Sequence, residues 1–185
     1  KKQLRQNARP VPKEVLRIWS EELAKVGMDQ TTPLSFTSDL QTPLVVGVRK
    51  KALEAYLPDR YYTAEELHLI FQHELRHVFR RDAEIKLAWA VIRSLLWFNP
   101  LVWLAYSLLC RDLEMACDEA VVKTMSAEER KSYSAALLAC SVRGARIAAC
   151  PVAFGEVSVK QRIKNVLHYR KPAFWITIVA LVLVA

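Results

Sequence analysis

The sequence of 185 residues has 27 Lys and Arg against 19 Asp and Glu, a net charge of +8, and 52% of its residues are hydrophobic. A chain this apolar is not disordered, and its length is typical of one domain with a sizeable core. No two of its four glycines lie within ten residues of each other, which excludes a P-loop and a GxGxxG dinucleotide motif. The four cysteines include no CxxC pair, so a zinc ribbon is excluded and reduced thiols are expected.

Helical and extended patterns follow one another along the first half of the chain. Apolar residues recur at helical spacing over residues 12–26, which predicts a helix there. Residues 34–48 partly alternate and are rich in β-branched side chains. They are the only region predicted to be extended, and a hairpin is the arrangement expected. Thr63 and Glu66 form a capping box, which predicts a helix that continues to about Arg81.

The second half of the chain is predicted to be helical. Residues 87–110 are apolar, but Pro100 interrupts them, because proline removes a helical hydrogen-bond donor and clashes with the preceding turn. We therefore expect two helical pieces that meet in a bend and lie buried or partly in the membrane. Residues 102–124 contain neither Pro nor Gly, and a second capping box opens residues 126–142, so both segments are expected to be helices. The predicted fold class is mainly α with a small β-sheet or hairpin.

Unopposed positive charge lies at the two ends of the chain. Residues 1–13 and 160–171 each carry five basic residues and no acid, and the uncharged run 173–185 follows the second cluster. A bilayer span needs roughly 20 residues, so this run is interpreted as the start of a transmembrane helix, with a buried core helix as the alternative. Basic residues beside a span mark the cytoplasmic side. Residues 1–172 are therefore predicted to be a cytoplasmic domain of a multi-pass membrane protein.

The strongest chemical motif is His73-Glu-Leu-Arg-His77, within the helix that the first capping box opens. Histidines four residues apart share a helix face, so both imidazoles can bind one metal ion, and zinc suits them. Glu74 can reach a water at that metal, take its proton as the water attacks a carbonyl, and deliver the proton to the leaving amine. The alternative is an ordinary pair of surface histidines. His68 lies five residues before His73, on another face, and is not expected to be a ligand.

A zinc hydrolase needs a third protein ligand and one open position. The next helix carries an acidic patch among apolar residues, in which Glu114 and Asp118 are four residues apart and share a face. Glu114 as third ligand, with Asp118 orienting a ligand histidine, is a coherent arrangement. The spacing alone also leaves Asp112 and Glu119 open. Cys117 is interpreted as a small buried residue rather than a ligand.

These motifs together resemble the BlaR/MecR-type family of membrane metallopeptidases. The matching segments lie within residues 34–175 and are 41–48, 73–77, 80–82, 97–103, 112–119 and 162–175. The resemblance implies that His73, His77 and Glu114 bind one zinc ion. Glu74 would be the general base, and Asp118 would lie near the third ligand. The implied fold is a zincin-like metallopeptidase domain set between membrane helices.

The resemblance also implies a role in signal transduction, in which the protease cleaves itself and a transcriptional repressor when an external signal arrives. The extended segment 34–48 would then be an edge strand that pairs with substrate backbone. Sensing of β-lactams is not carried over, because this sequence contains no penicillin-binding Ser-x-x-Lys sensor. The expected partners are a protein substrate, membrane lipid and a second copy of the chain in a homodimer, without direct contact to nucleic acid.

Two other functions compete with this one. The first is a housekeeping membrane metalloprotease of the prenyl-protein or heat-shock type, which shares the His-Glu-x-x-His and Glu-x-x-x-Asp patterns. The blocks at residues 97–103 and 117–119 favour the signalling protease over it. The second is a non-catalytic membrane interaction module, and the presence of Glu74 argues against it because a scaffold needs no base.

Overall fold

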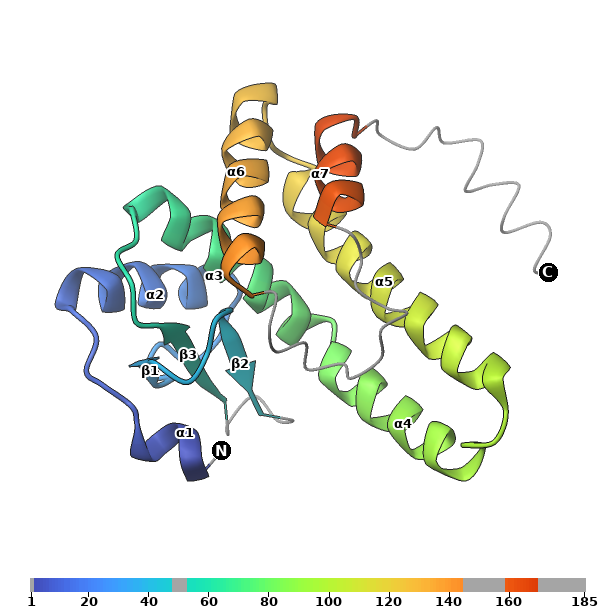
Figure 1. Ribbon diagram of the computed structural model, residues 1–185. Helices are drawn as coiled ribbons and strands as arrows, with labels where there is room; N and C mark the ends of the chain where they lie inside the picture. The colour runs from blue at the N-terminus through green and yellow to red at the C-terminus, as the bar shows by residue number, and fades with distance from the viewer. Residues whose placement is uncertain (1, 48–52, 145–158, 170–185) are drawn as a thin grey trace.

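The computed structural model describes residues 2–47, 53–144 and 159–169. The elements in chain order are α1 (Lys2–Gln6), α2 (Lys13–Lys25), β1 (Leu34–Thr37), β2 (Leu44–Val46), β3 (Glu54–Pro58), α3 (Ala64–Phe79), α4 (Asp82–Leu95), α5 (Pro100–Val122), α6 (Ala127–Gly144) and α7 (Val159–Leu167). The expected fold class, mainly helical with a small sheet, is confirmed (Figure 1). The transmembrane start predicted at 173–185 lies outside the described residues.

The sheet corrects the prediction of a hairpin. Its strand order is β1-β3-β2, with β1 parallel and β2 antiparallel to β3. The two strands within 34–48 therefore do not pair with each other, because β3 lies between them. The sequence analysis missed β3, whose five residues are all buried, since a central strand shows no alternation of polar and apolar residues. Arg9 pairs with Phe36 on the outer side of β1, and β2 is the opposite edge strand.

Helices α2 and α3 pack together behind this sheet and form the main core with it (Figure 1). Trp19 of α2 and Phe71 of α3 are almost fully buried, with ring centroids 4.8 Å apart. The predicted capping box of α3 is present, since the Thr63 hydroxyl accepts from the Glu66 backbone N–H and the Glu66 carboxylate accepts from the Thr63 N–H. The cap and the core contacts together fix the rotation of α3 about its axis.

Helices α4 and α5 form a hairpin that extends away from the sheet (Figure 1). The predicted break is confirmed: α4 ends at Leu95, and Asn99 caps α5 by accepting a hydrogen bond from the Leu101 N–H. Much of the hairpin's apolar surface is exposed rather than buried. The exposed large apolar side chains are Ile85, Leu87, Val91, Ile92, Leu95, Leu96, Trp97, Phe98, Leu101, Trp103, Leu104 and Leu108. Among the described residues, no helix has the length and apolarity needed to traverse a bilayer.

Helices α6 and α7 pack on each other and close the fold, α6 against α3 and α7 against α5. The second capping box is also present, with hydrogen bonds in both directions between Ser126 and Glu129. A small apolar cluster joins the end of α5 to Tyr133 of α6 and Val166 of α7. Helix α7 occupies part of the basic segment that had been interpreted only as the flank of a membrane helix. The packing of α6 brings Tyr133 close to His73 of α3, and the packing of α7 brings Arg162 close to the same histidine.

Candidate metal centre

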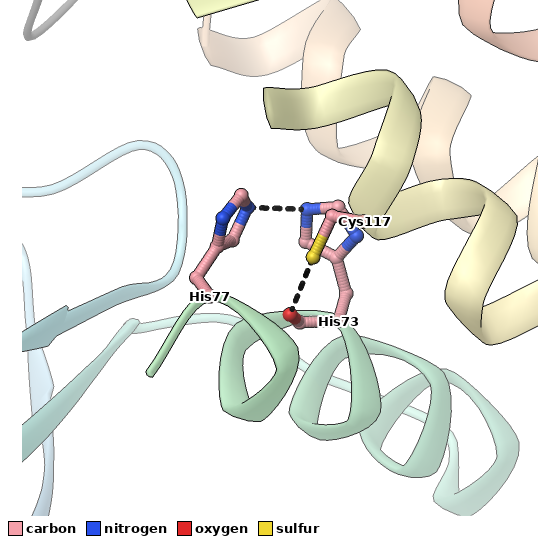
Figure 2. Close-up of side chains that lie close together, drawn as sticks. All are labelled: His73, His77 and Cys117. Carbon is pink, nitrogen blue, oxygen red and sulfur yellow. Dashed lines mark hydrogen bonds between the residues drawn. The ribbon is translucent and has the colours of Figure 1, made fainter. Parts of the chain in front are cut away.

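The two histidines of the motif lie side by side on α3 and face α5. Their Nε2 atoms are 3.1 Å apart, and His73 is buried while His77 is partly buried (Figure 2). This is the arrangement expected for residues one helical turn apart on one face. Both nitrogens can therefore point toward a single ion.

Glu114 of α5 supplies a third donor at the same place. One carboxylate oxygen, Oε2, lies 3.5 Å from the Nε2 atom of His73 and 3.6 Å from that of His77. Donor atoms about 2.0–2.1 Å from a tetrahedral zinc ion lie about 3.4 Å from one another. The spacing of these three atoms therefore fits a zinc-sized ion.

Cys117 is a rival third donor in the structure. Its Sγ and ligand nitrogens of His73 and His77 all lie within 4.8 Å of one another. However, the thiol is directed at the backbone oxygen of His73, at 3.4 Å (Figure 2). Burial raises the pKa of this thiol, whereas zinc binds the thiolate. Burial alone would raise the pKa of the Glu114 carboxyl, but hydrogen bonds with His73 and His77 lower it. Glu114 is therefore ionised and is the better candidate.

A second set of polar side chains orients the imidazoles. The Tyr133 hydroxyl donates to Asp118 at 2.7 Å and lies 2.8 Å from Nδ1 of His73. Because the hydroxyl hydrogen of Tyr133 is used in the hydrogen bond to Asp118, the hydroxyl oxygen accepts from Nδ1–H of His73. The Nε2 atom of His73 is then unprotonated and free to bind a metal. The buried carboxylate of Asp82 lies 2.7 Å from Nδ1 of His77 and acts in the same way.

Asp82 and Tyr133 were missed by the sequence analysis. Asp82 follows Arg81, whose backbone is left-handed with φ of 60°, and this tight reversal turns the start of α4 back toward His77. The acid at the end of Arg80-Arg81-Asp82 was the available signal. For Tyr133 no signal existed, because only the packing of α6 on α3 brings it to the site.

Asp118 lies beside His73, with Oδ1 3.3 Å from Nδ1. It is almost fully buried, and its charge is balanced by Arg162 of α7. The guanidinium donates from Nε to Oδ2 at 2.6 Å and from Nη2 to Oδ1 at 2.7 Å. Burial alone would raise the pKa of Asp118, but these hydrogen bonds lower it to about 2. The sequence analysis did not expect Arg162 at the site.

The other residues considered as ligands in the sequence analysis lie away from the candidate metal centre. The side chain of Asp112 is 63% exposed and pairs with its neighbour Arg111, and Glu119 is exposed. Neither belongs to the cluster. His68 lies 2.7 Å from the buried Glu22 of α2, which agrees with its exclusion from the ligands.

Glu74 lies beside the cluster and lines a cavity of about 540 Å³. The cavity is otherwise lined by Val45, Gly47, Leu53, His77, Val78, Phe79, Arg81, Ala83 and Glu84. Burial raises the pKa of the Glu74 carboxyl, although the charges of His73 and His77 oppose that shift. A carboxylate with a raised pKa, next to candidate ligands and open to a cavity, is suited to accept a proton.

Comparison with known proteins places this site in a family. The family model described as BlaR1 peptidase M56 matches residues 1–166. The chain belongs to this family. Its membership confirms the resemblance drawn from the sequence and implies a metal-dependent peptidase domain.

Individual proteins similar to this chain agree with its membership in the M56 family. The chain is 27% identical over 143 residues to the methicillin resistance mecR1 proteins of Staphylococcus aureus and Staphylococcus epidermidis, covering 74% of this chain and 24% of each relative. It is 25% identical over 162 residues to the regulatory protein BlaR1 of Bacillus licheniformis, covering 85% of this chain and 27% of that protein. The chain thus spans about a quarter of the length of these relatives.

Proposed function

We propose that this chain is the catalytic domain of a membrane-anchored zinc endopeptidase in signal transduction, and that it cleaves itself, a transcriptional repressor, or both. The observation that carries the proposal is the convergence of three donor atoms, from His73, His77 and Glu114, within 3.6 Å of one another. Glu74 lies beside them at the wall of a cavity.

His73, His77 and Glu114 would hold the zinc ion, which supplies a Lewis acid that lowers the pKa of water and polarises a carbonyl. Glu74 accepts a proton from the attacking water and passes it to the leaving amine. Tyr133 and Asp82 hold the two imidazoles in place through their Nδ1 atoms, so the Nε2 atoms stay directed at one point.

The substrate proposed is an extended peptide segment. β2 is an edge strand, and its Val45, with the following Gly47, lines the same cavity as Glu74. A peptide that adds to this edge by backbone hydrogen bonding would run past Glu74. The apolar wall formed by Leu53, Val78 and Phe79 would accommodate an apolar side chain next to the scissile bond.

Family membership favours signalling over the two alternatives. The relatives are named for methicillin resistance and for regulation, and the matching family is that of the BlaR1 peptidase rather than a housekeeping protease. A non-catalytic module is disfavoured because it would need no partly buried Glu74 with a raised pKa beside two histidines.

We also propose that the α4–α5 hairpin rests in the membrane, with the domain on the cytoplasmic side. Trp97 and Phe98 at its tip are 70% and 68% exposed, and continuous exposed apolar surface of this kind marks a contact site. Aromatic tips suit the lipid interface, and the net charge of +8 favours anionic lipid.

The decisive test is Glu74→Gln in the full chain. This variant should keep about one zinc per chain, because Glu74 is not a proposed ligand. Self-cleavage, followed as fragments by mass spectrometry, should slow by about 10²–10⁴-fold, the usual contribution of a general base. Glu65→Gln on the exposed side of α3 is the matched control and should cleave at the wild-type rate. Retained turnover in Glu74→Gln would remove Glu74 from this role.

A further inference from the structure

Arg162 reaches the candidate metal centre from α7, 89 residues along the chain from His73. Its side chain is only 15% exposed. Two of its donors clamp the Asp118 carboxylate, while Nη1 lies 3.4 Å from Oε2 of Glu114 and Nη2 lies 3.4 Å from Nε2 of His73. The guanidinium therefore faces the point on which the proposed ligands converge.

Not all of its N–H groups are used by Asp118. A guanidinium has five N–H donors, and the carboxylate takes one from Nε and one from Nη2. The remaining N–H groups lie near Oε2 of Glu114 and Nε2 of His73, and both of these atoms are proposed metal ligands. When Nε2 of His73 binds a metal, its single lone pair is engaged, so the Nη2 donor that faces it is left directed at the site without an acceptor. Oε2 of Glu114 keeps a second lone pair, which can still accept from Nη1.

Peptide hydrolysis creates such an acceptor. As water adds to the scissile carbonyl, a carbon–oxygen bond forms and the C=O π electron pair moves to the carbonyl oxygen, which becomes negatively charged. Glu74 takes the proton of the water and returns it to the amine as the carbon–nitrogen bond breaks. Donors fixed in advance toward the developing negative charge lower the barrier of this step.

We propose that Arg162 is a further catalytic residue, which hydrogen-bonds the carbonyl oxygen of the scissile bond as that oxygen gains charge. The proposal rests on the proposed peptidase function. Arg162 transfers no proton in this step. Asp118 acts as its anchor, because a bidentate pair with a buried carboxylate fixes the plane of the guanidinium. A lysine at this position could keep the charge but could not hold Asp118 and present further donors in the same fixed geometry.

Arg162→Lys in the full chain tests this role, with Arg17→Lys on the exposed side of α2 as the matched control. The probe is inorganic phosphate, a tetrahedral anion, titrated into cobalt-substituted protein and followed by the visible cobalt spectrum. We expect unchanged metal content, at least about tenfold weaker phosphate binding and about 10²–10³-fold slower self-cleavage in Arg162→Lys, as for loss of an oxyanion donor. Arg17→Lys should behave as wild type.

A paired change guards against misfolding. Replacing both partners, in Arg162→Met with Asp118→Asn, leaves no unpaired buried charge and should keep the helical circular dichroism of the wild type. This variant should hold metal and lose phosphate binding.

Each contrary result has one meaning. Wild-type phosphate affinity in either metal-loaded variant overturns the proposal. Loss of metal from Arg162→Lys assigns Arg162 to support of the ligands and also overturns it, as does metal-loaded wild type that binds no phosphate. If the wild type itself neither binds metal nor cleaves, the proposed peptidase function has failed, which is a distinguishable result.

Discussion

The two halves of α5 distribute their side chains in opposite ways. In the first half, Leu101 and Leu104 are 68% and 53% exposed. In the second half, Asp118 is 3% exposed and Glu114 is partly buried. Apolar residues thus face outward at one end of a single helix, while two carboxylates face inward at the other, the reverse of the usual preference.

The difference shows what each half requires. The inward carboxylates find their partners within the described residues, since Asp118 pairs with Arg162 and Glu114 lies near both histidines and Lys86. A buried charge is tolerated only with such partners. For the outward apolar half, the proposed partner is the membrane. Under the two proposals, one end of α5 serves catalysis and the other serves contact with the membrane.

The largest expected effect comes from removing the carboxylate of Glu114, in the second half of α5. Glu114→Ala should reduce zinc content from about one per chain to nearly none, because a three-ligand site does not survive on two imidazoles at ordinary zinc concentrations. Cys117→Ser should keep its zinc. Metal analysis of both dialysed proteins decides between the two donors. The opposite pattern, zinc lost with Cys117 and kept without Glu114, would reassign the third ligand.

A smaller effect is expected from the residues that orient the ligands. Asp82→Asn should weaken zinc binding by about 10–100-fold, the usual cost of removing a hydrogen-bond partner of a ligand histidine. Competition with a chelator of known affinity measures this change. Asp112→Asn, on the exposed face of the same α5 helix that carries Glu114, is the control. Equal affinities in the two variants would show that Asp82 does not support His77.

The pH dependence of zinc binding should be steep. In the metal-free protein burial tends to lower the pKa of His73, but hydrogen bonds to Asp118 and Glu114 raise it to about 9. Below that pH the imidazole is protonated, and zinc must displace the proton. The apparent affinity should therefore rise about tenfold per pH unit from pH 7 to 9 and then level off. Calorimetry at pH 7 in buffers of different ionisation enthalpy should detect the released proton, and a flat profile would contradict the prediction.

The smallest effect on the metal site is expected from changes at the tip of the α4–α5 hairpin, next to the exposed half of α5. Trp97→Ser with Phe98→Ser should weaken binding to anionic lipid vesicles by at least about tenfold, since each exposed aromatic ring contributes about 1.5–3 kcal/mol on burial. Zinc content should stay unchanged. Tyr61→Ser removes an aromatic ring that is 86% exposed elsewhere and serves as the control. Unaltered vesicle binding would show that the tip of the α4–α5 hairpin does not contact the membrane.

Sequence reasoning reached the parts of the site that helical periodicity controls. His73 with His77, and Glu114 with Asp118, are pairs one turn apart on α3 and α5, so their shared faces could be predicted from spacing. That α3 and α5 bring these faces together follows from tertiary packing, and spacing alone left Asp112 and Glu119 open. The resemblance to a family, rather than geometry, pointed to Glu114.

The remaining parts depend on contacts that no local pattern encodes. Tyr133 reaches His73 because α6 packs on α3, and Arg162 reaches it because α7 packs on α5 and α6. The insertion of β3 between β1 and β2 is likewise a matter of chain topology, and short apolar runs do not reveal which strands become neighbours. Residues that orient others are harder to predict than residues that bind.

The position of Arg162 in the chain has a consequence for biosynthesis. The three proposed ligands have all been synthesised once residue 114 leaves the ribosome, yet Tyr133 and then Arg162 follow much later. A nascent chain can therefore acquire its metal-binding residues well before the tyrosine and the guanidinium that complete the surroundings of His73. Under the proposed roles, the order of synthesis would delay a competent peptidase until residue 162 has been made, and this would limit premature cleavage of the growing chain.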